Sequence, residues 1–323
     1  MAVYVDSFQG GQVGIPVSAV GIVSLTAAKA APLLLASLGG LLSESSGVIN
    51  FALEGMMLIG AFMAVWVAHA SGSPWIGLAG GLLGGMAIGF LHSVVSLKFR
   101  ANQIVSSIAL NLLAAGVAGM LLNEVFGVYG TSPSVAGLPT TNQALASVFS
   151  KIGIAGEPEV PLIGGMSVLI PLAVLLGLAV MAFIAWSTTG LHIRACGENP
   201  HAARAAGLPV TGIRFLAVVA GGGLAGLGGA FLSIGELSQF VERMTHGRGY
   251  LAIAALILGR WRPAGVLAAV LVFGFGQALS EWLAVRWTYL PDQVFLVFPY
   301  AVCLSVLVVR IGSKRPPSAL GRL

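Results

Sequence analysis

Long apolar runs, separated by short polar or glycine-rich stretches, dominate this sequence and most constrain its fold. A helix needs about 20 apolar residues to cross the hydrocarbon core of a bilayer. Eight runs approach or exceed this length, and another, at 248–259, is too short to span alone. We therefore expect eight or nine transmembrane helices, with 248–259 either spanning or re-entering. The runs lie at about 13–42, 50–69, 75–97, 103–126, 163–186, 213–235, 248–259, 264–285 and 293–311.

The composition agrees with an all-α polytopic membrane protein. Only 8% of the residues are charged and 57% are hydrophobic, whereas a soluble domain carries roughly a quarter charged residues. This excludes a soluble enzyme, a disordered chain and a nucleic-acid binder. The 45 glycines fit closely packed membrane helices. A stripe predicted to pack helices together is formed by Gly77, Gly81, Gly85 and Gly89.

Basic residues predict which segments face the cytoplasm, because Lys and Arg favour cytoplasmic loops. We assign the loop 187–212 and the C-terminus to that side. The polar segment 127–162 then lies outside as an irregular loop that either meets a partner or only connects. The chain forms a single transmembrane domain over 1–323, with halves at about 13–126 and 163–311. The basic residues used are Lys98, Arg100, Arg194, Arg204, Arg214, Arg260, Arg262, Arg310, Lys314, Arg315 and Arg322.

Apolar runs are interrupted at comparable places in the two halves. The first interruption is at 43–50 and the second at 259–265. Paired interrupted segments are typical of transporters that are built from internal repeats. The pattern therefore indicates an internal repeat.

A few polar side chains lie in or beside the apolar runs, where burial is costly unless they are paired or face water. Glu54 begins one run, and Asn50 precedes it by one helical turn. They either line a pathway or clamp the break at 43–50. The amides at the start of the fourth run either bind a polar solute or cross-link helices. These amides are Asn102, Gln103 and Asn111.

The segment 236–248 combines charged and aromatic residues at the expected external mouth of the short run. Gln239 and Phe240 in this segment are further candidates for a pathway that takes a polar, ring-bearing solute. Docking of an external partner, or a plain salt-bridged loop, explains the same residues equally well.

The loop 187–212 contains the strongest local helix signals. Asn199 is a suitable N-cap, Pro200 takes the first helical position, and Gly207 suits the position after the last turn. These signals predict a short helix over 200–206 whose alanines fit a groove in another protein. It could also be only a capped helix within a loop. The residues assigned to this contact are Arg194, Glu198, Asn199, Pro200, Ala203, Arg204 and Gly207.

The sequence lacks the motifs of common catalytic sites. It has no Gly-x4-Gly-Lys-Ser/Thr phosphate loop, no His-Glu-x-x-His and no clustered Cys and His. We therefore expect a transport subunit rather than an enzyme, with no cofactor and no metal. A stand-alone channel or an ion-driven carrier is the alternative from a different class.

Three stretches give the chain a resemblance to a known family. They are 38–57, 101–113 and 194–207, which read LGGLLSESSGVINFALEGMM, ANQIVSSIALNLL and RACGENPHAARAAG. The chain resembles the permease subunits of bacterial ABC importers for ribose-type sugars, branched-chain amino acids and nucleosides. It is most similar to the shorter permease of nucleoside (guanosine-type) importers, with mild departures at Ser45 and Phe51.

The resemblance implies a place in the bacterial inner membrane and a set of partners. Such permeases pair with a second permease, here expected to be a different chain, and with cytoplasmic ATPase subunits. An external substrate-binding lipoprotein delivers the solute, and membrane lipid surrounds the pair. The segment 194–207 would contact the ATPase. The implied cargo is a nucleoside, with a simple sugar or a branched-chain amino acid as alternatives.

Overall fold

The computed structural model describes residues 19–151, 165–286 and 316–322, with the single positions 297, 301 and 305. These residues form helices and no strands, apart from two isolated bridges. The α-helices are α1 Ala19–Ser45, α2 Leu53–Ser71, α3 Pro74–Ser93, α4 Gln103–Phe126, α5 Thr141–Lys151, α6 Leu169–Trp186, α7 Thr188–Glu198, α8 Pro200–Ala205, α9 Val210–Ala230, α10 Arg248–Leu258 and α11 Pro263–Arg286. Two π-helical segments, η1 Val94–Lys98 and η2 Phe231–Leu237, extend α3 and α9.

Seven of these helices are long and apolar enough to cross a membrane. This confirms the prediction of an all-α polytopic membrane protein. The spans are Gly21–Ser45, Leu53–Ser71, Pro74–Lys98, Gln103–Phe126, Leu169–Trp186, Val210–Leu237 and Pro263–Ala284. The predicted run at 293–311 lies almost entirely outside the described residues.

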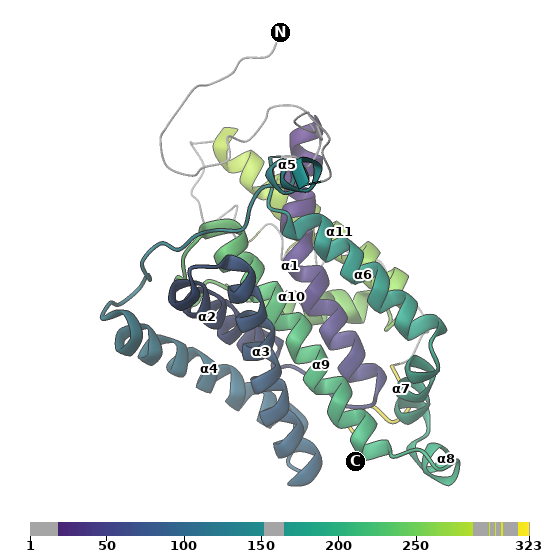
Figure 1. Cartoon of the computed structure of the whole chain (residues 1–323). Coiled ribbons are helices and arrows are strands. Elements are labelled where there is room, and N and C mark those ends of the chain that lie inside the picture. Colours follow the sequence, from purple (N-terminus) through teal and green to yellow (C-terminus); the bar gives the residue numbers. More distant parts are fainter. Residues whose placement is uncertain are drawn as a thin grey trace.

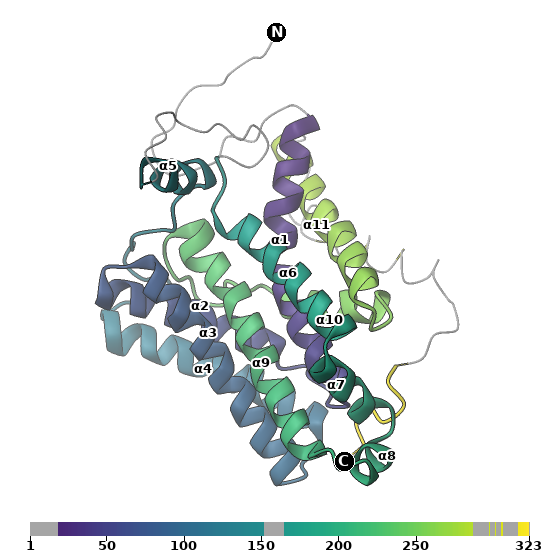
Figure 2. The same ribbon diagram turned by 45° about the vertical axis from the view of Figure 1, so that its right-hand side comes forward.

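Helix α9 lies at the centre of the bundle, where it packs against α1, α2 and α3 (Figures 1 and 2). The predicted glycine stripe explains how closely these helices approach. A Cβ added at Gly85 would collide with the carbonyl oxygen of Gly222 on α9. The stripe therefore serves helix packing, because larger side chains would push α3 away from α9 and, at Gly77, away from α2.

The two predicted interruptions separate α1 from α2 and α10 from α11. At the second, Arg260 and Trp261 both adopt positive φ values, 56° and 53°, in a tight turn. The indole N–H of Trp261 donates a hydrogen bond to the carboxyl group of Glu44, near the C-terminal end of α1. The interruptions of the two halves thus touch each other inside the bundle.

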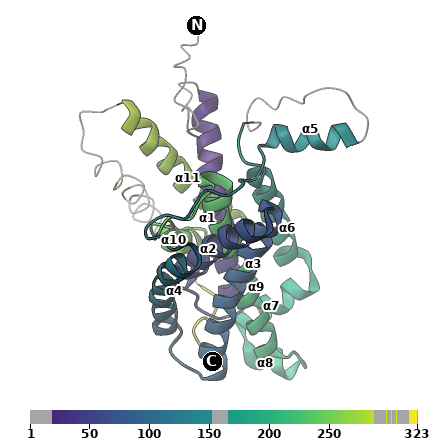
Figure 3. The same ribbon diagram turned by 60° about the vertical axis from the view of Figure 1, so that its left-hand side comes forward.

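Helix α10 is a partial-depth helix rather than a full span. Its 11 residues extend about 16 Å, whereas the hydrocarbon core is about 30 Å thick. Its C-terminal turn ends beside α1, and α11 then runs alongside α1 (Figure 3). The short run at 248–259 is therefore too short to span the membrane by itself.

Two predicted loops contain helices that we did not expect. The segment 127–162 was expected to be irregular, but α5 forms within it because Thr140 and Gln143 make a reciprocal capping box. The Thr140 N–H donates to Oε1 of Gln143 over 3.0 Å, and the Gln143 N–H donates to Oγ1 of Thr140 over 3.3 Å. In the loop 187–212, Ser187 caps α7 by accepting from the Gly190 N–H over 2.9 Å.

One basic residue lies inside the first span. Lys29 on α1 is 7% exposed, and its Nζ lies 2.8 Å from a carboxylate oxygen of Glu236 and 2.8 Å from one of Glu281. Pairing with two carboxylates makes burial of this ammonium group tolerable. The contact joins α1 to η2 and α11.

Candidate functional site

The backbone between α1 and α2, residues 46–52, is not α-helical, and its polar groups need partners within an apolar bundle. Asn50 bonds to the backbone of the break at one end and to the end of α1 at the other. Its Nδ2 donates to Oγ of Ser43 over 3.0 Å, and its Oδ1 accepts from the Ala52 N–H over 3.1 Å. The Asn50 side chain is fully buried, so in this conformation it holds the shape of the break.

Helix α4 presents a ladder of polar side chains to this break. Gln103 Oε1 accepts from the Ile49 N–H over 2.7 Å, and Ser107 Oγ accepts from the Phe51 N–H over 3.1 Å. Asn111 Oδ1 accepts from the Gly55 N–H over 2.8 Å, while its Nδ2 donates to the Phe51 carbonyl over 2.8 Å. Residues spaced by four share one helix face. That spacing lets α4 satisfy the backbone that the break leaves open.

His92 on α3 completes the cluster from the other side. Its ring nitrogens lie 3.2 Å from Oγ of Ser106 and 3.0 Å from the carbonyl oxygen of Ile49. Sequence reasoning missed His92, although a lone histidine near the end of an apolar run was a visible signal. Within the described residues, Nε2 of Gln103 is buried with no hydrogen-bond partner. The cluster therefore keeps one free donor beside the break.

Glu54, the carboxylate singled out from the sequence, caps α10. Its Oε1 accepts from the Gly247 N–H over 2.8 Å and its Oε2 from the Gly249 N–H over 2.7 Å. A carboxylate is favourable at a helix N-terminus, where backbone N–H groups lack partners. Asn111 adds a second link, because its Nδ2 donates to the Tyr250 hydroxyl over 3.1 Å. Together they tie α10 to α2 and α4.

The structure brings Asn50, Glu54, Gln103 and Asn111 to one region around the first break, and it places the other three candidates elsewhere. Asn102 is the exposed N-cap of α4. Phe240 is fully buried and packs edge-on against Phe62, with ring centroids 5.4 Å apart. Gln239, next to it, is half-buried.

The predicted short helix in the loop 187–212 is present as α8. Asn199 Oδ1 accepts from the Ala202 N–H over 3.0 Å, Pro200 opens the helix, and Gly207 follows it with a φ of 84°. Ala203 is buried against Cys196 and Val210 rather than exposed to a partner.

The outward surface of α8 carries His201, Ala202, Arg204 and Ala205. On α7, Arg194 donates to the Ala185 carbonyl over 3.3 Å, and Glu198 accepts from Ser318. Burial raises the pKa of the Cys196 thiol, so this residue packs as a neutral group. The segment thus presents a short, basic, exposed helix that packs on the buried side chains of Cys196 and Val210.

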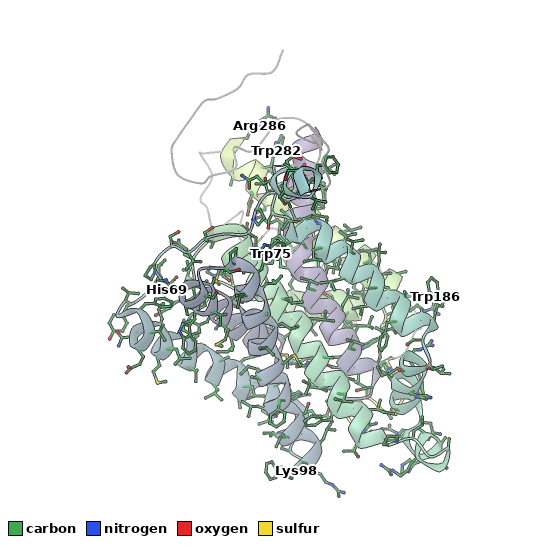
Figure 4. All side chains as sticks on the ribbon, viewed as in Figure 1. His69, Trp75, Lys98, Trp186, Trp282 and Arg286 are labelled. Carbon is green, nitrogen blue, oxygen red and sulfur yellow. The ribbon has the colours of Figure 1, made fainter. Side chains whose placement is uncertain are left out.

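Three of the basic segments lie at one end of the molecule. Helix α8 and the C-terminus lie at that end in Figures 1 and 2, and Lys98 lies at the same end in Figure 4. Trp282 and Arg286 lie at the opposite end, as does α5 (Figures 1 and 4). Among the described residues, no group of three His, Cys, Asp or Glu side chains could hold a metal ion.

A bundle of interrupted membrane helices with a capped surface helix is typical of a membrane transport subunit, and comparison with known proteins gives its class. Residues 22–307 match the family described as the branched-chain amino acid transport system permease component. The chain belongs to this family, and it is a permease subunit of an ABC importer rather than an enzyme.

Several curated proteins are similar to this chain over most of its length. The guanosine ABC transporter permease protein NupQ of Bacillus subtilis is 34% identical, over 93% of this chain and 95% of that protein. The nucleoside ABC transporter permease protein NupC of Lactococcus lactis is 32% identical, over 90% and 92%. The putative glucose ABC transporter permease protein TsgC13 of Haloferax volcanii is 33% identical, over 94% of this chain and 96% of that protein. No solved structure matches.

Proposed function

We propose that this chain forms one half of the translocation pathway of a nucleoside importer in a bacterial inner membrane. The similarity to guanosine and nucleoside permeases from two organisms, each over at least 90% of the chain, carries this proposal. The polar cluster at the first break supports it, because a nucleoside needs hydrogen-bonding groups within an apolar bundle. The free amide donor of Gln103 is the group we assign to the solute.

The pathway is proposed to run beside the first break, past Asn50, Glu54, Gln103 and Asn111. In this conformation the side-chain oxygen atoms of these residues accept hydrogen bonds from backbone N–H groups. Opening would exchange some of these bonds for bonds to the solute, which has donors and acceptors of its own. Asn102, at the start of α4, and the half-buried Gln239 would mark the two entrances, whereas Phe240 is fully buried against Phe62 and is not assigned to an entrance.

We assign α7 and α8 to contact with a cytoplasmic ATPase subunit. The exposed Arg204 and the capped helix around it support this assignment, since a contact that transmits force needs a helix with a fixed start and end. The C-terminus lies beside these helices and is placed in the cytoplasm because basic segments favour that side. The remaining proposed partners are a second, different permease and an external binding lipoprotein.

A glucose-type sugar is the second candidate cargo, favoured by the similarity to the putative glucose permease of Haloferax volcanii, which also covers more than 90% of the chain. The discriminating experiment is thermal stabilisation of the binding protein that is encoded beside this permease. A bound ligand stabilises the folded state by mass action. We expect a rise in melting temperature with guanosine and other nucleosides. A rise only with sugars or branched-chain amino acids would overturn the nucleoside assignment.

A further inference from the structure

Arg214, near the start of α9, is a buried cation that pairs with backbone rather than with a carboxylate. The residue is 3% exposed. Its Nε donates to the Ser46 carbonyl over 2.9 Å, its Nη2 to the Cys196 carbonyl over 3.1 Å and its Nη1 to the Arg322 carbonyl over 2.8 Å. Within 19–151, 165–286 and 316–322, no carboxylate forms an ion pair with it. One guanidinium thus joins three segments that are far apart in sequence.

The positions of these carbonyls explain why a cation is favourable there. Ser46 directly follows the last residue of α1, and Cys196 lies in the last turn of α7. Helix C-termini present carbonyls without intrahelical partners and carry partial negative charge. The planar guanidinium of arginine holds its donors in fixed, diverging directions, whereas a lysine carries its three donors on a single nitrogen atom. Arg214 therefore stabilises two helix ends together.

The C-terminal segment 316–322 completes the same contact. The Ala319 N–H donates to the Gly197 carbonyl over 2.9 Å, and the Gly321 N–H donates to the Gly47 carbonyl over 3.0 Å. Ser318 Oγ donates to the Glu198 carboxylate over 2.9 Å. The segment thus bonds both to the end of α7 and to the start of the first break.

Direct packing leaves no room for the two helix ends to slide past each other. A Cβ at Gly197 would collide with the carbonyl oxygen of Ser45. At Gly47, which has a φ of 99°, a Cβ would lie 2.7 Å from Nη2 of Arg214. Glycine is needed at both positions for this close approach.

We propose that Arg214 and the segment 316–322 form a clamp that makes α7 and the C-terminal end of α1 move as one body. The proposal rests on the assignment of α7 and α8 to the ATPase contact. A movement of α7 at the ATPase contact would then move the end of α1 as well. The first break and the polar cluster around Asn50 would move with it. Arg214 is a positioning residue in this scheme, since its donors all bond to protein backbone.

The test uses the complete complex in proteoliposomes and measures solute taken up per ATP hydrolysed. Arg214→Gln, and separately removal of residues 316–323, should lower this ratio about tenfold, since each leaves buried carbonyls unpaired. Arg214→Lys should give an intermediate ratio because it keeps the charge and loses the fork. The matched control is Arg286→Lys, at an exposed arginine at the other end of the molecule. Co-purification of the ATPase should persist throughout.

A cross-link provides a second arm that does not depend on the folding of those variants. Glu198→Cys and Ser318→Cys, with the native cysteines replaced by serine, would be joined by a short thiol-reactive linker. Because Glu198 belongs to the assigned ATPase contact, the comparison is made within the same double-cysteine variant, and we expect equal transport before and after joining, since the two positions move together. Loss of transport on joining, or an unchanged ratio without residues 316–323, would overturn the clamp. If the unmodified complex hydrolyses ATP but takes up no nucleoside, the proposed cargo fails and the clamp is tested with whichever solute is transported.

Discussion

At the scale of single residues, the buried polar side chains of this chain mostly serve its backbone. Each break in a membrane helix exposes N–H and C=O groups that hydrocarbon cannot satisfy. Asn50, Gln103 and Asn111 provide partners for the first break, and Glu54 does so for the N-terminus of α10. If these side chains also bind the solute, they use the same atoms for it. Hydrogen bonds to the solute and hydrogen bonds to the backbone of the break therefore compete.

Asn111 should be the most sensitive member of this cluster. Asn111→Leu leaves the Gly55 N–H and the Phe51 carbonyl without partners, at a cost of about 1–3 kcal/mol for each group. Tyr250→Phe removes only one hydrogen bond to Asn111 and should cost about 1 kcal/mol. Thermal unfolding in detergent should rank the two variants in this order. Equal melting temperatures for both would contradict the assigned hydrogen bonds.

Glu54 should stabilise the protein through α10. Glu54→Gln replaces a carboxylate that accepts two backbone N–H bonds and should lower stability by about 1–2 kcal/mol. Glu124→Gln makes the same change at an exposed position on α4 and should cost about 0.5 kcal/mol or less. Melting temperatures of the two variants measure the difference. A Glu54→Gln protein as stable as the control would show that the cap is dispensable.

At the scale of elements, α8 is defined by its cap and by one buried alanine. Asn199→Ala should destabilise the helix by about 1 kcal/mol. Ala203→Leu should unseat α8 from Cys196 and Val210, whereas Ala205→Leu changes only the outward surface. We expect both leucine variants to insert in the membrane and to lose ATPase coupling, with lower thermal stability only for Ala203→Leu. Full coupling in the Ala205→Leu complex would argue against α8 as the contact.

The Lys29 cluster should fix α11 against α1. Lys29→Met leaves the Glu236 and Glu281 carboxylates facing each other without their shared cation. Glu281→Gln leaves the bond between Lys29 and Glu236 intact. Lys29→Met should therefore lower the melting temperature clearly more than Glu281→Gln does. The reverse order would show that the ion pairs do not hold these helices together.

The sequence predicts most of the elements, because their signals are local. Apolar length identifies the spans, and Asn199, Pro200 and Gly207 identify α8 within one residue of its observed end. The capping box of α5 was also visible, at Thr140 and Gln143, but the prolines around it favoured a loop. Local signals do not show which residues of distant segments contact each other. Nothing near Glu44 predicts that it meets Trp261.

The candidate site shows the same division between local and distant information. Four of the seven predicted pathway residues gather at the first break, because polar side chains are costly elsewhere in an apolar bundle. Phe240 was predicted for the pathway from its position in a charged segment, yet it packs on Phe62 in the core. Arg214 was predicted only to mark the cytoplasmic side, since its three carbonyl partners come from segments distant in sequence.

At the scale of the whole molecule, the two interrupted segments meet in the bundle. The first of them is also bonded to Arg214 and to the C-terminal segment 316–322. This arrangement suits a protein that converts motion at α7 and α8 into a change at the first break. Transporters with broken helices alternate between two states by moving one part of the bundle against another. The family to which this chain belongs supplies ATP hydrolysis from a separate subunit.

Uptake of radiolabelled guanosine into proteoliposomes tests this account most directly. The vesicles would contain this chain, its partner permease and the ATPase, with the binding protein added outside. We expect uptake that requires ATP, the binding protein and this chain together. Equal uptake by this chain alone without ATP would contradict the account and identify a channel or an ion-driven carrier.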